Sequence, residues 1–145
     1  MAAISIINNG EAMSSVRSKL NNVITEVNLL DPTDWVDYSA TSTIVGWSSF
    51  TTKVIKYRVI GKQVFFNIDL NGTSNSTSTS FTLPYNSNTI NALNSNWSTN
   101  NGTNLTGYFV TSVNTNICIG YINFSTVWTA TGTKRMIGQF FIEIA

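Results

Sequence analysis

Residues 13–30 read MSSVRSKLNNVITEVNLL, and the apolar side chains of this stretch recur at alternating steps of three and four residues. Such spacing is the a/d stripe of a heptad repeat and predicts a short coiled-coil helix. The stripe is narrower than the face that a helix usually packs on its own globular core, and it suits identical helices around a common axis. We therefore expect copies of the chain to associate along this seam. The seam residues are Met13, Val16, Leu20, Val23, Val27 and Leu30.

A second interpretation of the same stripe is a helix docked on the chain's own β domain, and Ile24, just beside the seam, fits either arrangement. An isolated helix of this length is only marginally stable. In the oligomeric interpretation, a later part of the chain must therefore associate together with the helix. Pro32 ends the helix, because its ring disfavours helical backbone at Asp31 and it lacks an N–H donor.

The chain before the helix contains Ile4, Ile6 and Ile7, which would form an exposed apolar patch in a free monomer. We expect these isoleucines to pair within the oligomer or to dock onto another protein, and we favour docking. The chain then divides into an attachment segment over 1–12, the helix over 13–32 and a β domain over 33–145.

From Trp35 onward the sequence is typical of β-strands. Residues 63–70 read QVFFNIDL, in which every second side chain from Val64 to Leu70 is apolar, so one face of this strand belongs to a core. Ile60-Gly61-Lys62 predicts a hairpin with the segment before it. Short strands without helices between them predict an antiparallel β-sandwich of the jelly-roll kind. The predicted strands span residues 42–50, 53–60, 63–70, 80–84, 105–113, 117–124 and 136–144.

Two polar stretches, 71–79 and 86–103, separate these strands and consist largely of Asn, Ser and Thr. Their composition predicts ordered loops rather than packed strands. Recognition residues are often carried by loops on a rigid scaffold. Trp97 lies in the second stretch and is therefore a candidate for recognition.

The composition argues against several classes of partner. Charged residues make up 10% of the chain and the formal net charge is +1, so the electrostatic footprint of a nucleic-acid-binding protein is absent. No apolar run approaches the length of a membrane span, and the first residues lack the features of a signal peptide. We therefore expect a soluble chain made in the cytoplasm, with no nucleic-acid partner and no membrane insertion.

The sequence contains no histidine, which excludes Ser-His-Asp and Cys-His catalysis and the usual zinc ligand sets. Asp31, Asp34 and Asp37 are spaced by three, but they lack the glycine and ligand alternation of a calcium loop, and we favour Asp34 as an Asx-turn former. The single cysteine, Cys118, has apolar neighbours and is expected to be buried. We expect neither an enzyme nor a cofactor.

Aromatic side chains stand out against this neutral background. Sugar rings present apolar C–H faces that stack on flat aromatic rings, while Asn and Thr side chains hydrogen-bond to hydroxyl groups. A neutral surface with exposed aromatic residues therefore suits a glycan. The candidates for glycan contact are Trp97, Tyr85 and Tyr108, whereas Trp47 is better explained as a core or subunit-interface residue.

Two stretches together resemble the fibre proteins of tailed bacteriophages. Residues 6–28 are similar to an N-terminal attachment segment followed by a short trimeric helix, and residues 40–84 are similar to the β head of fibre and receptor-binding proteins. The first resemblance is carried by Gly10, Glu11, Val16, Arg17, Leu20 and Asn21. The second is carried by Gly46-Trp47, Tyr57, Gly61-Lys62, Gly72-Thr73-Ser74-Asn75 and the closing Phe81-Thr82-Leu83-Pro84.

This resemblance implies a homotrimeric virion fibre that is not an enzyme. Its N-terminal segment, with Ile4, Ile6 and Ile7, would anchor to a capsid or tail protein, and its β head would face glycan on the host surface. A head fibre that decorates the capsid and a tail component both remain open. The rival hypothesis is a stand-alone lectin or carbohydrate-binding module without a virion role.

Overall fold

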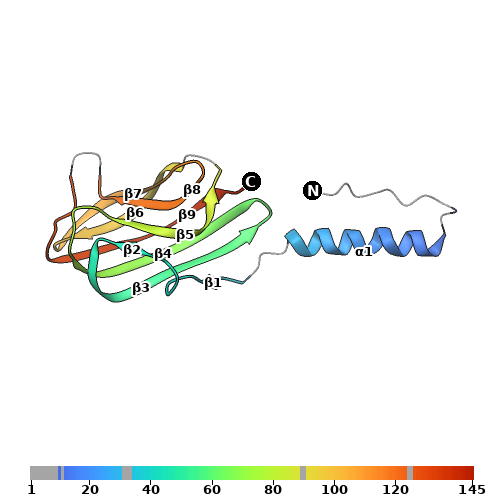
Figure 1. The fold of residues 1–145 in the computed structure, drawn as a ribbon, viewed down its shortest axis with the longest axis horizontal. Coiled ribbons are helices and arrows are strands. Elements are labelled where there is room, and N and C mark those ends of the chain that lie inside the picture. The colour runs from blue at the N-terminus through green and yellow to red at the C-terminus, as the bar shows by residue number, and fades with distance from the viewer. Residues whose placement is uncertain (1–9, 11, 31–33, 89–90, 124–125) are drawn as a thin grey trace.

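The structure, a computed structural model, describes residues 10, 12–30, 34–88, 91–123 and 126–145, with the side chains of 25–30 and 91–95 left out. Helix α1 (Met13–Leu30) has the bounds that the heptad spacing predicts. It begins where the carbonyl of Ala12 accepts hydrogen bonds from the backbone N–H groups of Ser15 and Val16. Figure 1 shows α1 beyond one end of the β domain rather than against a face of its sheet. The described helix lacks the apolar length needed to cross a membrane.

Nine described strands follow the helix and form one antiparallel sheet in the order β1-β3-β4-β9-β6-β7-β8-β5-β2. The sheet curls on itself, and the C-terminus lies at the end nearest α1 (Figure 1). The predicted class, mainly β with antiparallel pairing and one short helix, is confirmed. The strands are β1 (Val36–Asp37), β2 (Ile44–Val45), β3 (Trp47–Ile60), β4 (Gln63–Ser74), β5 (Ser80–Ser87), β6 (Asn91–Asn100), β7 (Thr103–Thr111), β8 (Thr115–Tyr121) and β9 (Thr133–Glu143).

The inner face of the curled sheet encloses an aromatic and aliphatic core. The alternation predicted for residues 63–70 is confirmed, because Val64, Phe66, Ile68 and Leu70 are all fully buried. The Phe140 ring of β9 stacks on Phe66, with centroids 4.8 Å apart. The remaining core side chains come from β3, β5, β7, β8 and β9 and from the chain between β8 and β9. They include Trp47, Ile55, Phe81, Leu83, Phe109, Cys118, Ile122, Trp128, Met136 and Ile142.

The prediction of a loop over 86–103 is wrong, because residues 91–100 form β6 and pair with both β7 and β9. Its inward side chains Asn96, Ser98 and Asn100 are buried although they are polar. Ser98 Oγ donates to Asn96 Oδ1, and Asn100 Oδ1 accepts from the backbone N–H and the hydroxyl of Thr129 at 3.1 and 2.9 Å. Hydrogen bonds therefore replace the apolar contacts that usually mark a buried strand face.

Glycines on the strands that flank β6 leave room for Asn96. Gly107 of β7 pairs directly with Asn96, and a Cβ atom added there would clash with Asn96 Oδ1 and with the Tyr121 carbonyl. A Cβ atom added at Gly138 of β9 would lie 3.1 Å from the Asn96 Cβ. A polar strand fits the middle of this sheet because its neighbours lack side chains at these two points.

The other predicted loop, over 71–79, is partly strand, since Asn71–Ser74 continue β4 and pair with β3 and β9. The hairpin expected at Ile60-Gly61-Lys62 joins β3 to β4 as predicted, and Gly61 has a φ of 59°. Predicted strands 42–50 and 53–60 instead form β2 and the long β3. Bulges in β3 between Trp47 and Ser49 and between Phe50 and Thr52 let it bend without ending.

One of the acidic residues that follow the helix, Asp37, forms a turn. The Asx-turn expected at Asp34 is found at Asp37, whose Oδ1 accepts from the Ser39 N–H at 2.8 Å. Hydrogen bonds from the side chain and backbone of Ser39 lower the pKa of Asp37. Asp31 lies outside the described residues, and within the described ranges no three potential metal ligands gather.

Candidate carbohydrate-binding surface

Three aromatic side chains lie on the outer face of neighbouring strands β6, β7 and β8. In the register, Tyr108 of β7 pairs with Tyr121 of β8 and Trp97 of β6 pairs with Thr106 of β7. The rings of Tyr108 and Tyr121 stack at 5.0 Å with an interplanar angle of 12°. We call Trp97, Tyr108 and Tyr121 the aromatic track. Adjacent strands are about 4.8 Å apart, so the aromatic track extends over about 10 Å from β6 to β8. Trp97 and Tyr121 are 44% and 40% exposed.

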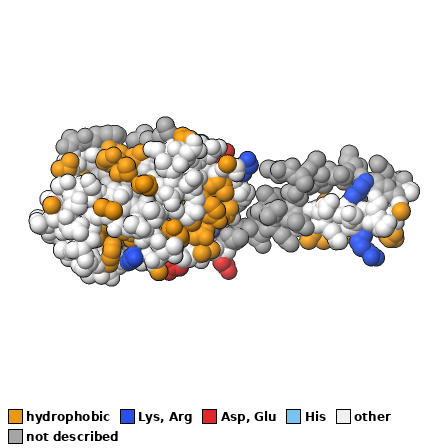
Figure 2. Space-filling view, in the orientation of Figure 1, with side chains coloured by type: hydrophobic (Ala, Val, Ile, Leu, Met, Phe, Trp, Pro, Cys, Tyr) orange, Lys and Arg blue, Asp and Glu red, His pale blue; other side chains and the backbone are white. Residues whose placement is uncertain are grey.

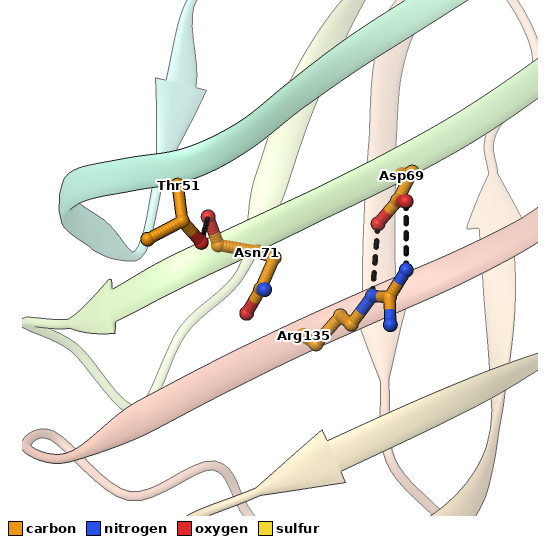
Figure 3. Close-up of polar contacts among 4 residues, drawn as sticks. All are labelled: Thr51, Asp69, Asn71 and Arg135. Carbon is orange, nitrogen blue, oxygen red and sulfur yellow. Dashed lines mark hydrogen bonds and ion pairs between the residues drawn. The ribbon is translucent and has the colours of Figure 1, made fainter.

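An ion pair borders the aromatic track at Trp97. The Arg135 guanidinium lies over the Trp97 ring, 5.5 Å from its centroid, and its Nε and Nη2 donate to the two carboxylate oxygens of Asp69 at 3.0 and 2.8 Å (Figure 3). These hydrogen bonds raise the pKa of Arg135. Asp69 and Arg135 come from adjacent strands β4 and β9, so the pair holds a charged, planar group beside an exposed tryptophan.

The structure brings together two of the three predicted glycan-contact residues. Trp97 and Tyr108 belong to the aromatic track, whereas Tyr85 of β5 packs edge-on against Tyr57, 5.8 Å between centroids, away from the track. The predicted glycan contacts do not include Tyr121, which is one of the aromatic residues that the sequence offers. The alternation within β8 carried the signal, because Cys118 and Tyr121 lie an odd number of residues apart and so face opposite sides.

A cleft of about 430 Å³ opens beside Tyr121, and we call it the Tyr121 cleft. The hydroxyl-bearing residues 77–80 line it on one part of the chain, and the apolar residues Ile119, Tyr121 and Val127 complete the lining. Trp128 forms part of the lining and is held in place by its Nε1, which donates to the Gly120 carbonyl at 2.9 Å. The cleft therefore combines a stacking surface with hydrogen-bonding groups, as sugar sites do.

A buried ammonium group lies directly behind the wall of the Tyr121 cleft. Lys134 is 0% exposed, and its Nζ donates to Gly46 O, Ser76 O and Thr79 Oγ1 at 3.0, 2.7 and 3.1 Å. The Nζ also lies 5.1 Å from the ring centroids of both Trp47 and Trp128. Within the described residues, no carboxylate pairs with this cation. Burial lowers its pKa from 10.5 to about 8.

The lowered pKa of Lys134 predicts a pH dependence of stability. Between pH 8 and 10.5 the unfolded chain binds a proton at this group that the folded chain has released, so this contribution to stability rises with pH. Relative to Lys134→Met, we expect the wild-type free energy of unfolding to increase by about 2–3 kcal/mol between pH 7 and pH 10. Urea unfolding of both proteins at each pH measures this difference.

The comparison with Lys134→Met removes the effects of other groups. Burial raises the pKa of Cys118 and of Tyr57, so both oppose the Lys134 effect at alkaline pH, but both are present in each protein. A difference that stays constant with pH, or that falls, would contradict the assignment of an uncompensated buried cation.

A second apolar region lies at the end of the β domain nearest α1, where Figure 2 shows hydrophobic side chains gathered. There a hollow of about 180 Å³ is lined by residues that include Trp35, Phe65 and Phe141. The Arg58 guanidinium stacks over Trp35 and Phe65, 5.1 and 5.7 Å from their centroids. The hollow is smaller and has fewer polar groups than the Tyr121 cleft, so it is the weaker candidate for a sugar.

The side chains of Val27 and Leu30, and the whole of Ile4, Ile6 and Ile7, lie outside the described residues, so the structure does not bear on these predicted contacts. Of the seam residues that are described, Met13 and Leu20 are 76% and 51% exposed. Comparison of the chain with protein-family models, with curated proteins and with solved structures finds no match.

Proposed function

We propose that this chain is a homotrimeric fibre protein of a tailed-bacteriophage virion. Its N-terminal segment anchors to the capsid or tail, α1 forms a three-stranded coiled coil, and the β domain is a head that adheres to host-surface glycan. The observation that carries the proposal is the combination of exposed apolar side chains on α1, including Met13 and Leu20 of the heptad stripe, with an outward-facing aromatic track on the sheet.

The exposure of α1 supports self-association. Met13, Leu20 and Ile24 are at least half exposed, and Figure 1 shows no strand covering the helix. Apolar surface left in water costs about 25 cal/mol per Å². Identical helices would cover this stripe through a/d packing, and the resemblance to phage fibres favours three copies.

Contacts across the core support a jelly-roll-like sandwich. Strand β5 is separated from β9 in the sheet order by β6, β7 and β8, yet the Phe81 ring of β5 lies 6.4 Å from the Phe140 ring of β9. Tyr85 of β5 likewise contacts Tyr57 of β3. The two halves of the curled sheet therefore face each other over a shared core, as the layers of a sandwich do.

A stand-alone lectin is the second candidate, because the aromatic track and the Tyr121 cleft lie entirely within the β domain. The two proposals differ in what α1 does. Light scattering of the full chain at micromolar concentration should give three times the mass of one chain for the fibre, whereas a stable monomer would contradict it. Antibody labelling of intact phage particles then tests the virion location.

Replacing Trp97 by alanine tests the adhesive surface shared by both proposals. Exposed tryptophans at the centre of binding sites contribute about 2 kcal/mol, so we expect about 30-fold weaker binding to any glycan that the full chain binds on an array. Trp35→Ala is the matched control, because Trp35 is similarly exposed, at 39%, but lies at the α1 end of the β domain. Equal losses of glycan affinity in both variants would show that glycan binding does not depend on the aromatic track.

A further inference from the structure

The Tyr121 cleft has a charge environment that the aromatic track lacks. We propose that it binds an anionic group of a surface glycan, either the carboxylate of an acidic sugar or the phosphate of a sugar-phosphate polymer. This inference rests on the proposed function, because it takes a host-surface glycan as the ligand. It adds the chemical class of that glycan and a second binding site on the head.

Tyr121 joins the cleft to the aromatic track. Its ring stacks on Tyr108, and the residue also belongs to the cleft lining. A glycan chain stacked along Trp97 and Tyr108 therefore leads into the cleft without leaving the outer face of the sheet. Val127 at the cleft is 72% exposed, which places this residue at the solvent side of the cleft.

The Lys134 ammonium supplies a positive charge behind the cleft wall. Its Nζ lies 3.1 Å from Thr79 Oγ1 and 5.1 Å from the Trp128 ring centroid, and both residues line the cleft. The cleft lining contains no acidic residue, and no described carboxylate pairs with Lys134. A buried charge that no described carboxylate neutralises acts over several ångströms through a low-dielectric wall and favours an anion in the cleft.

The hydroxyl groups of the wall are suited to receive such an anion. Thr79 Oγ1 accepts from the Lys134 ammonium, so the Thr79 hydroxyl proton is directed away from it. Thr79 is only 2% exposed, so its hydroxyl connects the ammonium to the cleft lining and does not itself meet a ligand. Ser78 and Ser80, which also line the cleft, are more exposed and supply the hydroxyl donors. The wall thus offers donors, backed by a cation, to carboxylate or phosphate oxygens.

Binding of paired polymers to the full-length protein tests the proposal. The probes are an oligogalacturonate with its carboxyl-reduced counterpart, and a glycerol-phosphate polymer with a neutral glucan of similar length. We expect one acidic probe to bind at least about tenfold more tightly than its neutral counterpart, which corresponds to one anion-specific contact. The carboxylate and phosphate arms identify which acidic group the cleft accepts.

Two substitutions connect this preference to the cleft. Lys134→Met removes the buried charge with an unbranched side chain that fits between two indole rings, and Val127→Asp places a negative charge at an exposed position of the cleft. Both should reduce the acid preference to less than about threefold while neutral glycan still binds through Trp97. The matched controls are Lys62→Met at the β3–β4 turn and Val113→Asp, which is 42% exposed beyond β7, and both should retain the preference.

The outcomes separate this inference from the proposed function. Neutral and acidic probes that bind equally, with a loss in Trp97→Ala, would overturn the anion site but leave the adhesive head intact. An acid preference that persists in Val127→Asp, or that is lost equally in Val113→Asp, would also overturn it. If Lys134→Met does not fold, the comparison of Val127→Asp with Val113→Asp tests the anion site by itself. If no probe binds the full-length protein, the anion site is overturned, whereas the proposed fibre still stands or falls by its mass in light scattering and by its binding on the glycan array.

Discussion

Replacing Phe140 by alanine should lower the free energy of unfolding of the β domain by about 4 kcal/mol. Phe140 is 4% exposed and lies at the centre of the core, where its ring contacts Phe66, Phe109 and Phe81 with centroids 4.8, 4.9 and 6.4 Å apart. These contacts join β9 to β4, β7 and β5. Their loss would leave a cavity between the two halves of the curled sheet, and the rings around it come from three strands that cannot all move inward.

Urea unfolding followed by tryptophan fluorescence measures this loss, because Trp47 and Trp128 are buried and report on the core. Phe141→Ala is the matched control. Phe141 is the next residue along β9 but faces outward and is 41% exposed, so the same chemical change should cost less than about 1 kcal/mol. Similar losses for the two variants would show that the assignment of inner and outer faces on β9 is incorrect.

Replacing Leu20 by aspartate should unwind the helical bundle of the proposed trimer. Leu20 lies in the middle of the a/d seam, and in a trimer the substitution places three carboxylates around one axis. Desolvation of several like charges costs several kcal/mol. We expect the helical circular dichroism of α1 to be lost while light scattering still gives a trimer, because a helix of this length cannot supply most of the interface.

Ser18→Asp provides the control for this experiment. Ser18 lies on the same helix, off the seam and exposed, so the same charge should leave both helicity and mass unchanged. Dissociation of Leu20→Asp into folded monomers would show that the heads contribute little to assembly. Equal loss of helicity in the two variants would show that the seam does not hold α1 together with other copies.

Parts of the fold could be predicted from the sequence because their signals are local. The bounds of α1 follow from the heptad spacing and from Pro32, and the inner face of β4 follows from the alternation of Val64 to Leu70. In each case the residues that decide the element lie within it or directly after it. The burial of Cys118 is likewise expected from its apolar neighbours, and Trp47, within a strand-like stretch, is expected in the core or at a subunit interface and is buried.

Strand β6 could not be predicted in this way. Residues 91–100 carry no apolar alternation, and the features that stabilise them lie far away in the sequence. Thr129 donates to Asn100, while Gly107 and Gly138 leave space for Asn96. Because this strand was assigned to a loop, Trp97 was chosen for the wrong reason. Its exposure comes from the outer face of a central strand and not from a loop.

By itself, the sequence determined the elements whose periodicity repeats within a few residues, which are the heptad helix and the alternating strands. Its composition also excluded catalysis by histidine. Only the tertiary structure decided that Trp97, Tyr108 and Tyr121 share one surface and that Lys134 lies behind the Tyr121 cleft without a described carboxylate partner. The physical reason is that strand order and sheet curvature bring together residues that are distant along the chain. Hydrophobic periodicity reports which face a side chain takes but not which strand lies beside it.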